Sequence, residues 1–192
     1  SEEIIGRWIS ANKDRRSHFI LATKHSGKGL SHVRNGAPIT KDTIQNAVEG
    51  SLKRLKTDYI DLYQFHWPNR GSYMFRQNWK YDPSSQDKKS TLENMHECLV
   101  ILQKQVEKGN IRYFGLSNES AWGAANWLKL SEQHKLPRVA TIQNEYSLLC
   151  RLYDTDLAEL SVNEGVGLMA FPSVTYVEIK ATLLSSLSFF SI

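Results

Sequence analysis

Short apolar runs alternate with amphipathic segments along almost the whole chain, and this order constrains the fold more than any other feature. Runs rich in β-branched and aromatic residues predict strands at residues 18–24, 57–66, 110–118, 138–146 and 167–171. Apolar residues at helical spacing predict a helix at the start of the chain and one in each interval between strands. Because such a helix must bury its apolar stripe on the sheet, the order predicts parallel strands and the α/β class.

Capping signals indicate where the helices begin. Thr40 is suited to cap the helix that follows it. Ser90 with Glu93 forms a capping-box pattern, so we expect the next helix to begin there and to end at Gly109. The preceding interval, residues 67–89, is rich in Pro, Gly, Ser, Asn and aromatic residues without a period, which is typical of a loop that is functional or disordered.

Two folds satisfy the alternation: an open doubly wound sheet and a (β/α)8 barrel. A doubly wound sheet that binds a nucleotide needs a glycine-rich turn directly after a strand, and none of the predicted strands is followed by one. The strands end instead in polar or aromatic groups: Lys24, His66, Ser117 with Asn118, Gln143 with Asn144, and Phe171. A barrel assembles its chemistry from the carboxyl ends of several strands, so this distribution favours the barrel.

Each of these residues also has a purely structural explanation. Lys24 fits a strand that ends at the surface, and His66 fits a hydrogen-bonded core histidine. Ser117 and Asn118 are residue types that cap helices, and a helix follows them. The alternative is that all four line one site at the mouth of the barrel.

The remaining strand ends leave the same two interpretations open. Gln143 and Asn144 carry amides, which offer a donor and an acceptor in one plane and therefore suit a ligand amide. Phe171 is of a type found most often in cores, but at a strand end its face can stack on a planar ring. Each signal is weak alone, and the joint pattern is what indicates a binding site.

Composition and charge exclude several other classes of protein. The 192 residues are 41% hydrophobic and 23% charged, which is typical of a globular protein. The net charge of +4 is scattered, so we expect no nucleic-acid partner, and no segment has the roughly 20 apolar residues of a membrane span. Cys98 and Cys150 show neither disulfide-framework nor metal-site spacing, so we expect a reducing, cytoplasmic location and no metal.

Three stretches carry a resemblance to a known family: SLKRLKTDYIDLYQFHWP, KGNIRYFGLSN and TIQNEYSLL. Together they resemble the aldo-keto reductase superfamily, especially its bacterial-type members related to potassium-channel β subunits. The resemblance implies a (β/α)8 barrel that uses NADPH to reduce small aldehydes or ketones to alcohols. It also implies that Lys24 and His66 are the lysine and the histidine of a catalytic tetrad.

The same resemblance assigns the remaining residues to the cofactor and the substrate. Ser117, Asn118 and Gln143 would hold the nicotinamide carboxamide of NADPH. Phe171 would stack on the nicotinamide ring, where the family usually has a tyrosine. Trp67 and the loop after it would shape the substrate pocket. Hydride transfer builds negative charge on the carbonyl oxygen, so a hydrogen-bond donor and a proton source must face that oxygen.

The resemblance further implies that parts of the family's fold are missing. The tetrad's aspartate and its proton-donating tyrosine belong to a loop before the first helix, and we expect neither Tyr63 nor Tyr146 to replace that tyrosine. We expect an incomplete barrel that lacks the first two strands and the last strand. Residues 1–171 are then the partial barrel, and residues 172–192, which do not resemble the family, are a divergent tail.

Three functional interpretations follow. The chain is an NADP-dependent reductase by resemblance, a catalytically silent binding or regulatory module of the same fold that serves a partner protein, or a truncated product without function. NADPH binding tests them, because a chain that binds no NADPH would share only its descent with the family and not its function.

Overall fold

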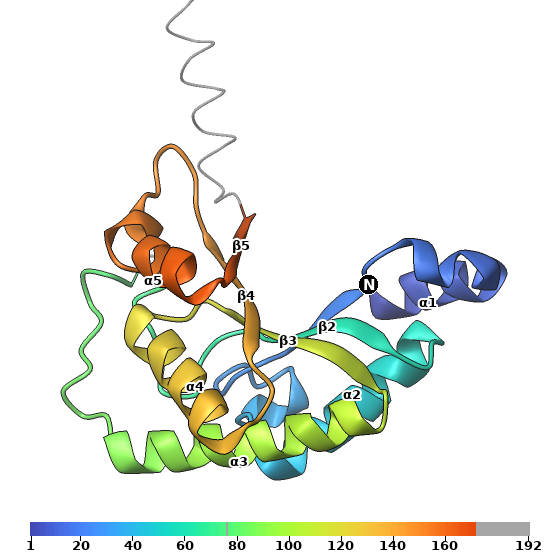
Figure 1. Ribbon diagram of the computed structural model, residues 1–192, viewed down its shortest axis with the longest axis horizontal. Helices are drawn as coiled ribbons and strands as arrows, with labels where there is room; N and C mark the ends of the chain where they lie inside the picture. The colour runs from blue at the N-terminus through green and yellow to red at the C-terminus, as the bar shows by residue number, and fades with distance from the viewer. Residues whose placement is uncertain (76, 172–192) are drawn as a thin grey trace, which may run out of the picture.

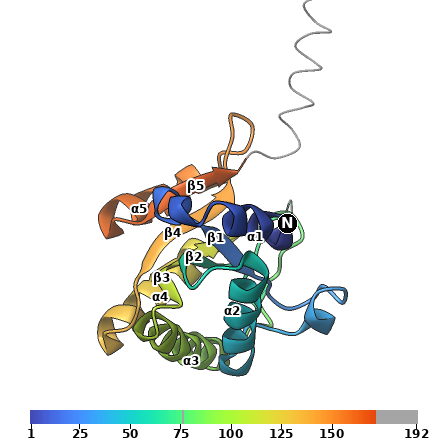
Figure 2. The same cartoon turned by 90° about the vertical axis from the view of Figure 1, so that its right-hand side faces the viewer.

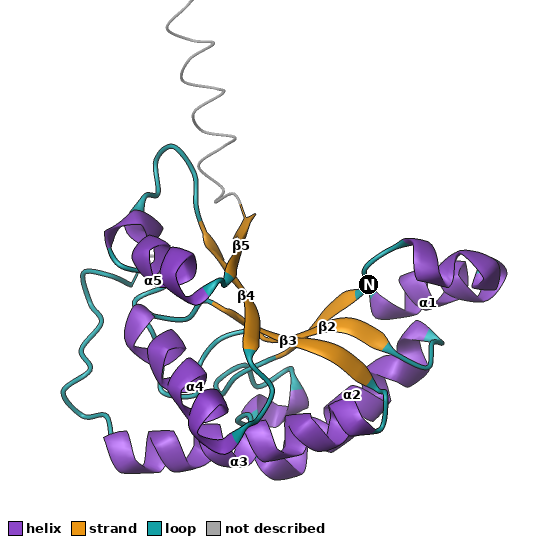
Figure 3. Cartoon of the chain, in the orientation of Figure 1, coloured by secondary structure: helices purple, strands orange, loops and turns teal. Residues whose placement is uncertain are grey.

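The computed structural model describes residues 1–75 and 77–171, which form a parallel sheet with helices along its outer face (Figure 1 and Figure 3). The strands lie side by side in the order of the sequence. They are β1 (Ala22–His25), β2 (Ile60–Phe65), β3 (Ile111–Ser117), β4 (Val139–Glu145) and β5 (Gly167–Phe171). Sequential parallel strands joined by helices are the arrangement of a (β/α)8 barrel, so the expected incomplete barrel is confirmed.

The helices follow one another around the outside of the strands, as Figure 2 shows. They are α1 (Glu2–Ala11), α2 (Lys41–Leu55), α3 (Lys88–Glu107), α4 (Ala121–His134) and α5 (Leu157–Glu164). Each contacts the next along the chain. Short 3-10 helices lie in the connections at Lys13–His18, Arg34–Gly36 and Leu152–Thr155. Within the described residues, no helix combines the length and the apolar character that crossing a bilayer requires.

The core lies between the sheet and this arc of helices. Phe65 of β2 and Phe114 of β3 meet edge to face at 4.9 Å between ring centroids, and both contact Trp127 of α4 at 5.6 Å. Burying an aromatic or branched aliphatic side chain stabilises the fold by about 1.5–3 kcal/mol. Successive strand residues face opposite sides, so the residues between these core positions face the interior of the barrel.

The first strand is shorter than predicted, because residues 13–18 form a 3-10 helix and β1 begins only at Ala22. The Asp61 carboxylate explains the difference. It accepts hydrogen bonds from the backbone N–H of Leu21 at 3.0 Å and from Arg16 at 2.7 Å. At Leu21 a side chain therefore binds the backbone N–H, while the backbone carbonyl accepts from the N–H groups of Asp61 and Leu62 at 3.0 and 3.1 Å.

The predicted beginning of α3 is also wrong. The helix starts at Lys88, and Asp87 caps it by accepting a hydrogen bond from the backbone N–H of Ser90 at 3.2 Å. Ser90 is thus inside the first turn. Gly109 lies just past the end of the helix with φ 74°, in agreement with the prediction, and the Thr40 cap of α2 is confirmed as a reciprocal capping box.

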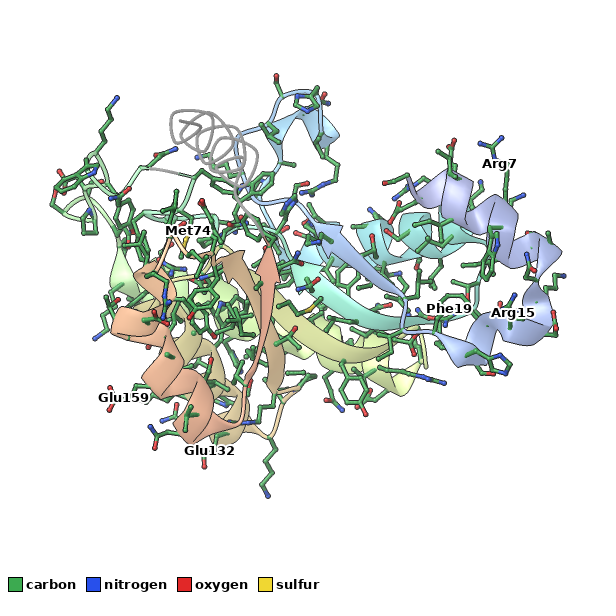
Figure 4. All side chains as sticks on the ribbon, turned by 90° about the horizontal axis from the view of Figure 1, so that it is seen from above. Arg7, Arg15, Phe19, Met74, Glu132 and Glu159 are labelled. Carbon is green, nitrogen blue, oxygen red and sulfur yellow. The ribbon has the colours of Figure 1, made fainter. Side chains whose placement is uncertain are left out.

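A buried charge cluster holds the amino-terminal end of β2. Asp61 is 6% exposed and also accepts a hydrogen bond from Arg112 at 2.9 Å. The Tyr59 ring lies against two guanidinium groups, with ring-to-carbon distances of 3.8 Å to Arg16 and 4.1 Å to Arg112. Figure 4 shows Phe19 beside this end of the sheet and Met74, from the loop after β2, beside the other end. In such barrels this end contributes to stability and the other carries the chemistry.

Candidate active site at the carboxyl ends of the strands

The carboxyl ends of neighbouring strands bring the predicted residues to one edge of the sheet. Lys24 on β1 is in register with Gln64 on β2, and Ser117 on β3 is in register with Gln143 on β4. His66 follows β2 directly, and its backbone N–H donates to the carbonyl of His25 at 2.9 Å. By the alternation of strand side chains, these candidates face the barrel interior.

The charge of Lys24 is close enough to His66 to affect the protonation of the imidazole. Burial lowers the pKa of the Lys24 ammonium. Burial also lowers the pKa of His66, and the positive charge of Lys24 lowers it further. His66 is therefore a neutral imidazole at pH 7, with one N–H to donate and one ring nitrogen to accept.

Asn118 is the most constrained residue of the site. Its backbone adopts φ 53°, a left-handed conformation that is uncommon outside glycine. Its backbone N–H donates to the carbonyl of Gln143 at 3.0 Å. Its side-chain nitrogen donates to the carbonyl of His66 at 2.9 Å and to the hydroxyl of Ser117 at 3.1 Å. The candidates on three successive strands are thus joined through one side chain and its backbone.

Three buried amide oxygens of this edge have no hydrogen-bond partner within the described residues: Oε1 of Gln64, Oδ1 of Asn118 and Oε1 of Gln143. Nearly all buried polar atoms in folded proteins have a partner, so unpaired acceptors are positions where a ligand donor fits. A carboxamide supplies an N–H₂ group for such oxygens and a carbonyl for neighbouring donors.

A sequence model of the aldo/keto reductase family matches residues 1–175. The chain belongs to the aldo/keto reductase family. Its sequence is 40% identical over 174 residues to "Protein tas" of Escherichia coli (strain K12), 36% over 165 residues to an "Aldo-keto reductase" of Babesia bovis, and 30% over 177 residues to "Uncharacterized oxidoreductase YrpG" of Bacillus subtilis (strain 168).

These comparisons cover 89%, 81% and 89% of this aldo/keto reductase chain, and 49%, 58% and 47% of the three relatives. The chain therefore spans about half the length of the curated relatives it matches. The family resemblance inferred from the sequence is confirmed, and the roles of the individual site residues stay predictions.

In this aldo/keto reductase chain, Trp67 spans two loops at the mouth. Its ring lies 4.6 Å from the His66 ring between centroids, and its indole N–H donates to the carbonyl of Lys28 at 3.1 Å. Gly27 allows this approach, because a Cβ there would lie 2.5 Å from the indole. Trp67 is thus held beside His66, and its role as a wall of the substrate pocket stays a prediction.

A cavity of about 520 Å³ lies behind this wall, between the loop after β2 and the helices α3 and α4. Trp67 and Ser117 line it together with Arg70 and Glu119, whereas Lys24 and His66 do not. It therefore adjoins the candidate site from the outer side of the sheet.

The adjacent amides at the end of β4 point to opposite faces of the sheet. Gln143 faces the interior. The Asn144 side chain accepts from the backbone N–H of Glu119 at 3.2 Å and donates to its carbonyl at 2.9 Å, so Asn144 is structural. Neither Ser117 nor Asn118 caps α4. Ser120 is the cap, and its side chain accepts a hydrogen bond from the backbone N–H of Gly123.

Phe171 is the last residue of β5 and shares the inner face with Met169. Its predicted stacking on the nicotinamide ring stays a prediction. Tyr63 is buried on the outer face, with its hydroxyl 3.2 Å from Nδ1 of His25, and the hydroxyl of Tyr146 donates to Asp154 at 2.9 Å. Both hydroxyl groups are therefore engaged elsewhere. The predicted tail, residues 172–192, lies outside the described residues.

Sequence reasoning missed Gln64. This residue is fully buried on the inner face beside Lys24, and its side-chain nitrogen is 3.4 Å from the carbonyl of Leu116 and 3.9 Å from the sulfur of Met169. Its amide oxygen has no partner within the described residues. A polar residue two positions before His66, on the same face of the strand by alternation, was the available signal.

Proposed function

We propose that this chain is part of an NADP-dependent aldo/keto reductase that reduces small aldehydes or ketones to alcohols. The proposal is carried by the two unpaired, buried oxygens of Asn118 and Gln143, beside Ser117 on adjacent strand ends. Their geometry suits the amide N–H₂ of a nicotinamide ring. Family membership supports the reaction class. A cytoplasmic location, where reduced thiols persist, is part of the proposal and is supported by the free buried thiol of Cys98.

In this mechanism the residues of the chain hold the cofactor and polarise the carbonyl group of the substrate. The nicotinamide supplies the hydride when bound. Neutral His66 donates a hydrogen bond from its ring N–H to the carbonyl oxygen of the substrate, where negative charge develops. The proton that completes the alcohol would come from the tyrosine that the family resemblance places before the first helix. The Lys24 ammonium adds a positive charge near the same oxygen. Phe171 offers an aromatic face to the nicotinamide ring, and Trp67 keeps the carbonyl beside His66.

The test is a fluorescence titration of the chain with NADPH. We expect binding by the parent chain and a loss of about tenfold or more for Asn118→Ala and for Gln143→Ala, since each removes an acceptor to a ligand donor. Asn126→Ala and Gln103→Ala are matched controls, because these amides lie on the outer surfaces of α4 and α3. No binding by the parent contradicts the proposal.

A further inference from the structure

Arg70 and Glu119 form a buried ion pair beside the candidate site. Their side chains are 7% and 2% exposed. The guanidinium contacts both carboxylate oxygens, with Nη1 donating to Oε2 at 3.2 Å and Nη2 contacting Oε1, and it also donates to the hydroxyl of Ser120 at 3.1 Å. Such bidentate ion pairs fix the relative orientation of the segments that carry them.

The pair joins the two segments that carry the predicted substrate and cofactor residues. Arg70 lies three residues after Trp67, and Glu119 directly follows Asn118. The side chain of Glu119 also accepts from the indole N–H of Trp127 at 3.4 Å, which fixes it against α4. The orientation of Asn118 therefore depends on a carboxylate held by the loop that carries Trp67.

A second set of contacts fixes the same loop on its other side. The Asn69 side chain accepts from the backbone N–H of Ile39 at 2.8 Å and donates to its carbonyl at 2.7 Å. Gln86 donates to the carbonyl of Arg70 at 3.2 Å. With the hydrogen bond from Asn118 to His66, these contacts leave the segment from residue 66 to residue 70 anchored at both ends.

Burying two charges carries a large desolvation cost, and apolar replacements of equal size are often as stable as the ion pair. Stability alone is thus a poor reason for this pair. We propose that Arg70 and Glu119 are positioning residues that hold the Trp67 wall in register with Asn118 and Gln143, so that carbonyl and nicotinamide meet in one geometry. This inference rests on the proposed function for its purpose, but its structural part is testable without it.

The main test replaces both charges together, as Arg70→Met with Glu119→Leu. This variant leaves no unpaired buried charge, so we expect it to fold with a melting temperature close to that of the parent. We expect its affinity for NADPH to fall by about tenfold or more, because misplacement of binding groups is costly. We also expect amide hydrogen exchange to rise in residues 66–71 and 117–119.

Two further variants make the result specific. Arg70→Lys keeps the charge and loses the bidentate geometry, so we expect an intermediate loss of NADPH affinity. This variant keeps the inference testable if the double variant fails to fold. Arg138→Met with Glu164→Leu removes an exposed ion pair before the amino-terminal end of β4 and is the matched control. We expect this control to bind and exchange like the parent.

Unchanged affinity and unchanged exchange in a folded double variant, or in Arg70→Lys if the double variant does not fold, overturn the inference. If the parent itself binds no NADPH, the proposed function is wrong. Amide hydrogen exchange in residues 66–71 and 117–119 then tests the positioning role by itself. In that case, increased exchange in both segments supports the coupling, and protection equal to that of the parent overturns it.

Discussion

The side-chain amide of Asn118 donates a hydrogen bond to the main-chain carbonyl of His66 at 2.9 Å, which ties the end of β3 to the end of β2. The same residue has a left-handed backbone and an unpaired side-chain oxygen. Strained backbone held by surrounding contacts is often found at functional sites. Substitutions of Asn118 therefore measure directly how much the contacts at this edge of the sheet contribute to the free energy of unfolding.

We predict that Asn118→Gly is more stable than Asn118→Ala. Both variants lose the same side-chain hydrogen bonds, but alanine also pays the steric cost of the left-handed conformation, about 1 kcal/mol. Urea denaturation of the two variants measures the difference in the free energy of unfolding directly. Equal stability, or a more stable alanine variant, would show that the backbone at this position is not held as described.

We predict an acid-sensitive stability that originates at His25. Burial, and then the charge of Arg34, lowers the pKa of His25 to about 3. The unfolded chain binds a proton below about pH 6.5 and the folded chain does not, so stability is lost as the pH falls from 6.5 towards 3, by about 1.4 kcal/mol per pH unit. Denaturation at pH 7, 6 and 5 measures this slope. His25→Gln should flatten it, and identical slopes would refute the assignment.

We predict that the two arginines bound to Asp61 differ in importance. Arg16→Met leaves part of a buried carboxylate uncompensated and should cost about 3–5 kcal/mol. Arg112 is 55% exposed at its side chain, so Arg112→Met should cost about 1 kcal/mol or less. Unfolding midpoints in urea rank the two variants. A larger effect for Arg112 would contradict the structure of the cluster.

We predict opposite effects for two glycine replacements in neighbouring helices. A Cβ at Gly6 of α1 would lie 2.1 Å from the carbonyl oxygen of Arg54, so Gly6→Ala forces α1 away from α2 and should cost about 1–3 kcal/mol. At Gly50 the nearest atom belongs to the flexible end of the Arg54 side chain, so Gly50→Ala should gain about 0.5–1 kcal/mol of helix stability. Thermal unfolding compares both with the parent, and destabilisation by both would disprove the distinction.

The order of strands and helices was readable from the sequence because periodicity reports which face of an element is buried. The placement of Lys24, His66 and Gln143 near the carboxyl ends of their strands was readable for the same reason, since each interrupts an apolar run. The start of α3 was not, because Asp87 and Ser90 are both good caps and only the tertiary fit of the loop selects between them. A local pattern therefore located the elements better than their boundaries.

The contacts between distant segments were not readable from one sequence. Arg70 and Glu119 are 49 residues apart, and nothing in the local pattern of either residue indicates the other. The opposite orientation of Gln143 and Asn144 follows from strand alternation, but the partner of Asn144 on the neighbouring segment does not. Long-range pairing depends on how the strand ends meet in space.

The charge cluster around Asp61 and the candidate residue His66 lie at opposite ends of the same strand. The rim that anchors the sheet is thus physically separate from the rim that would meet a substrate. Substitutions around the mouth therefore leave the ion pairs that hold the amino-terminal end of β2 untouched.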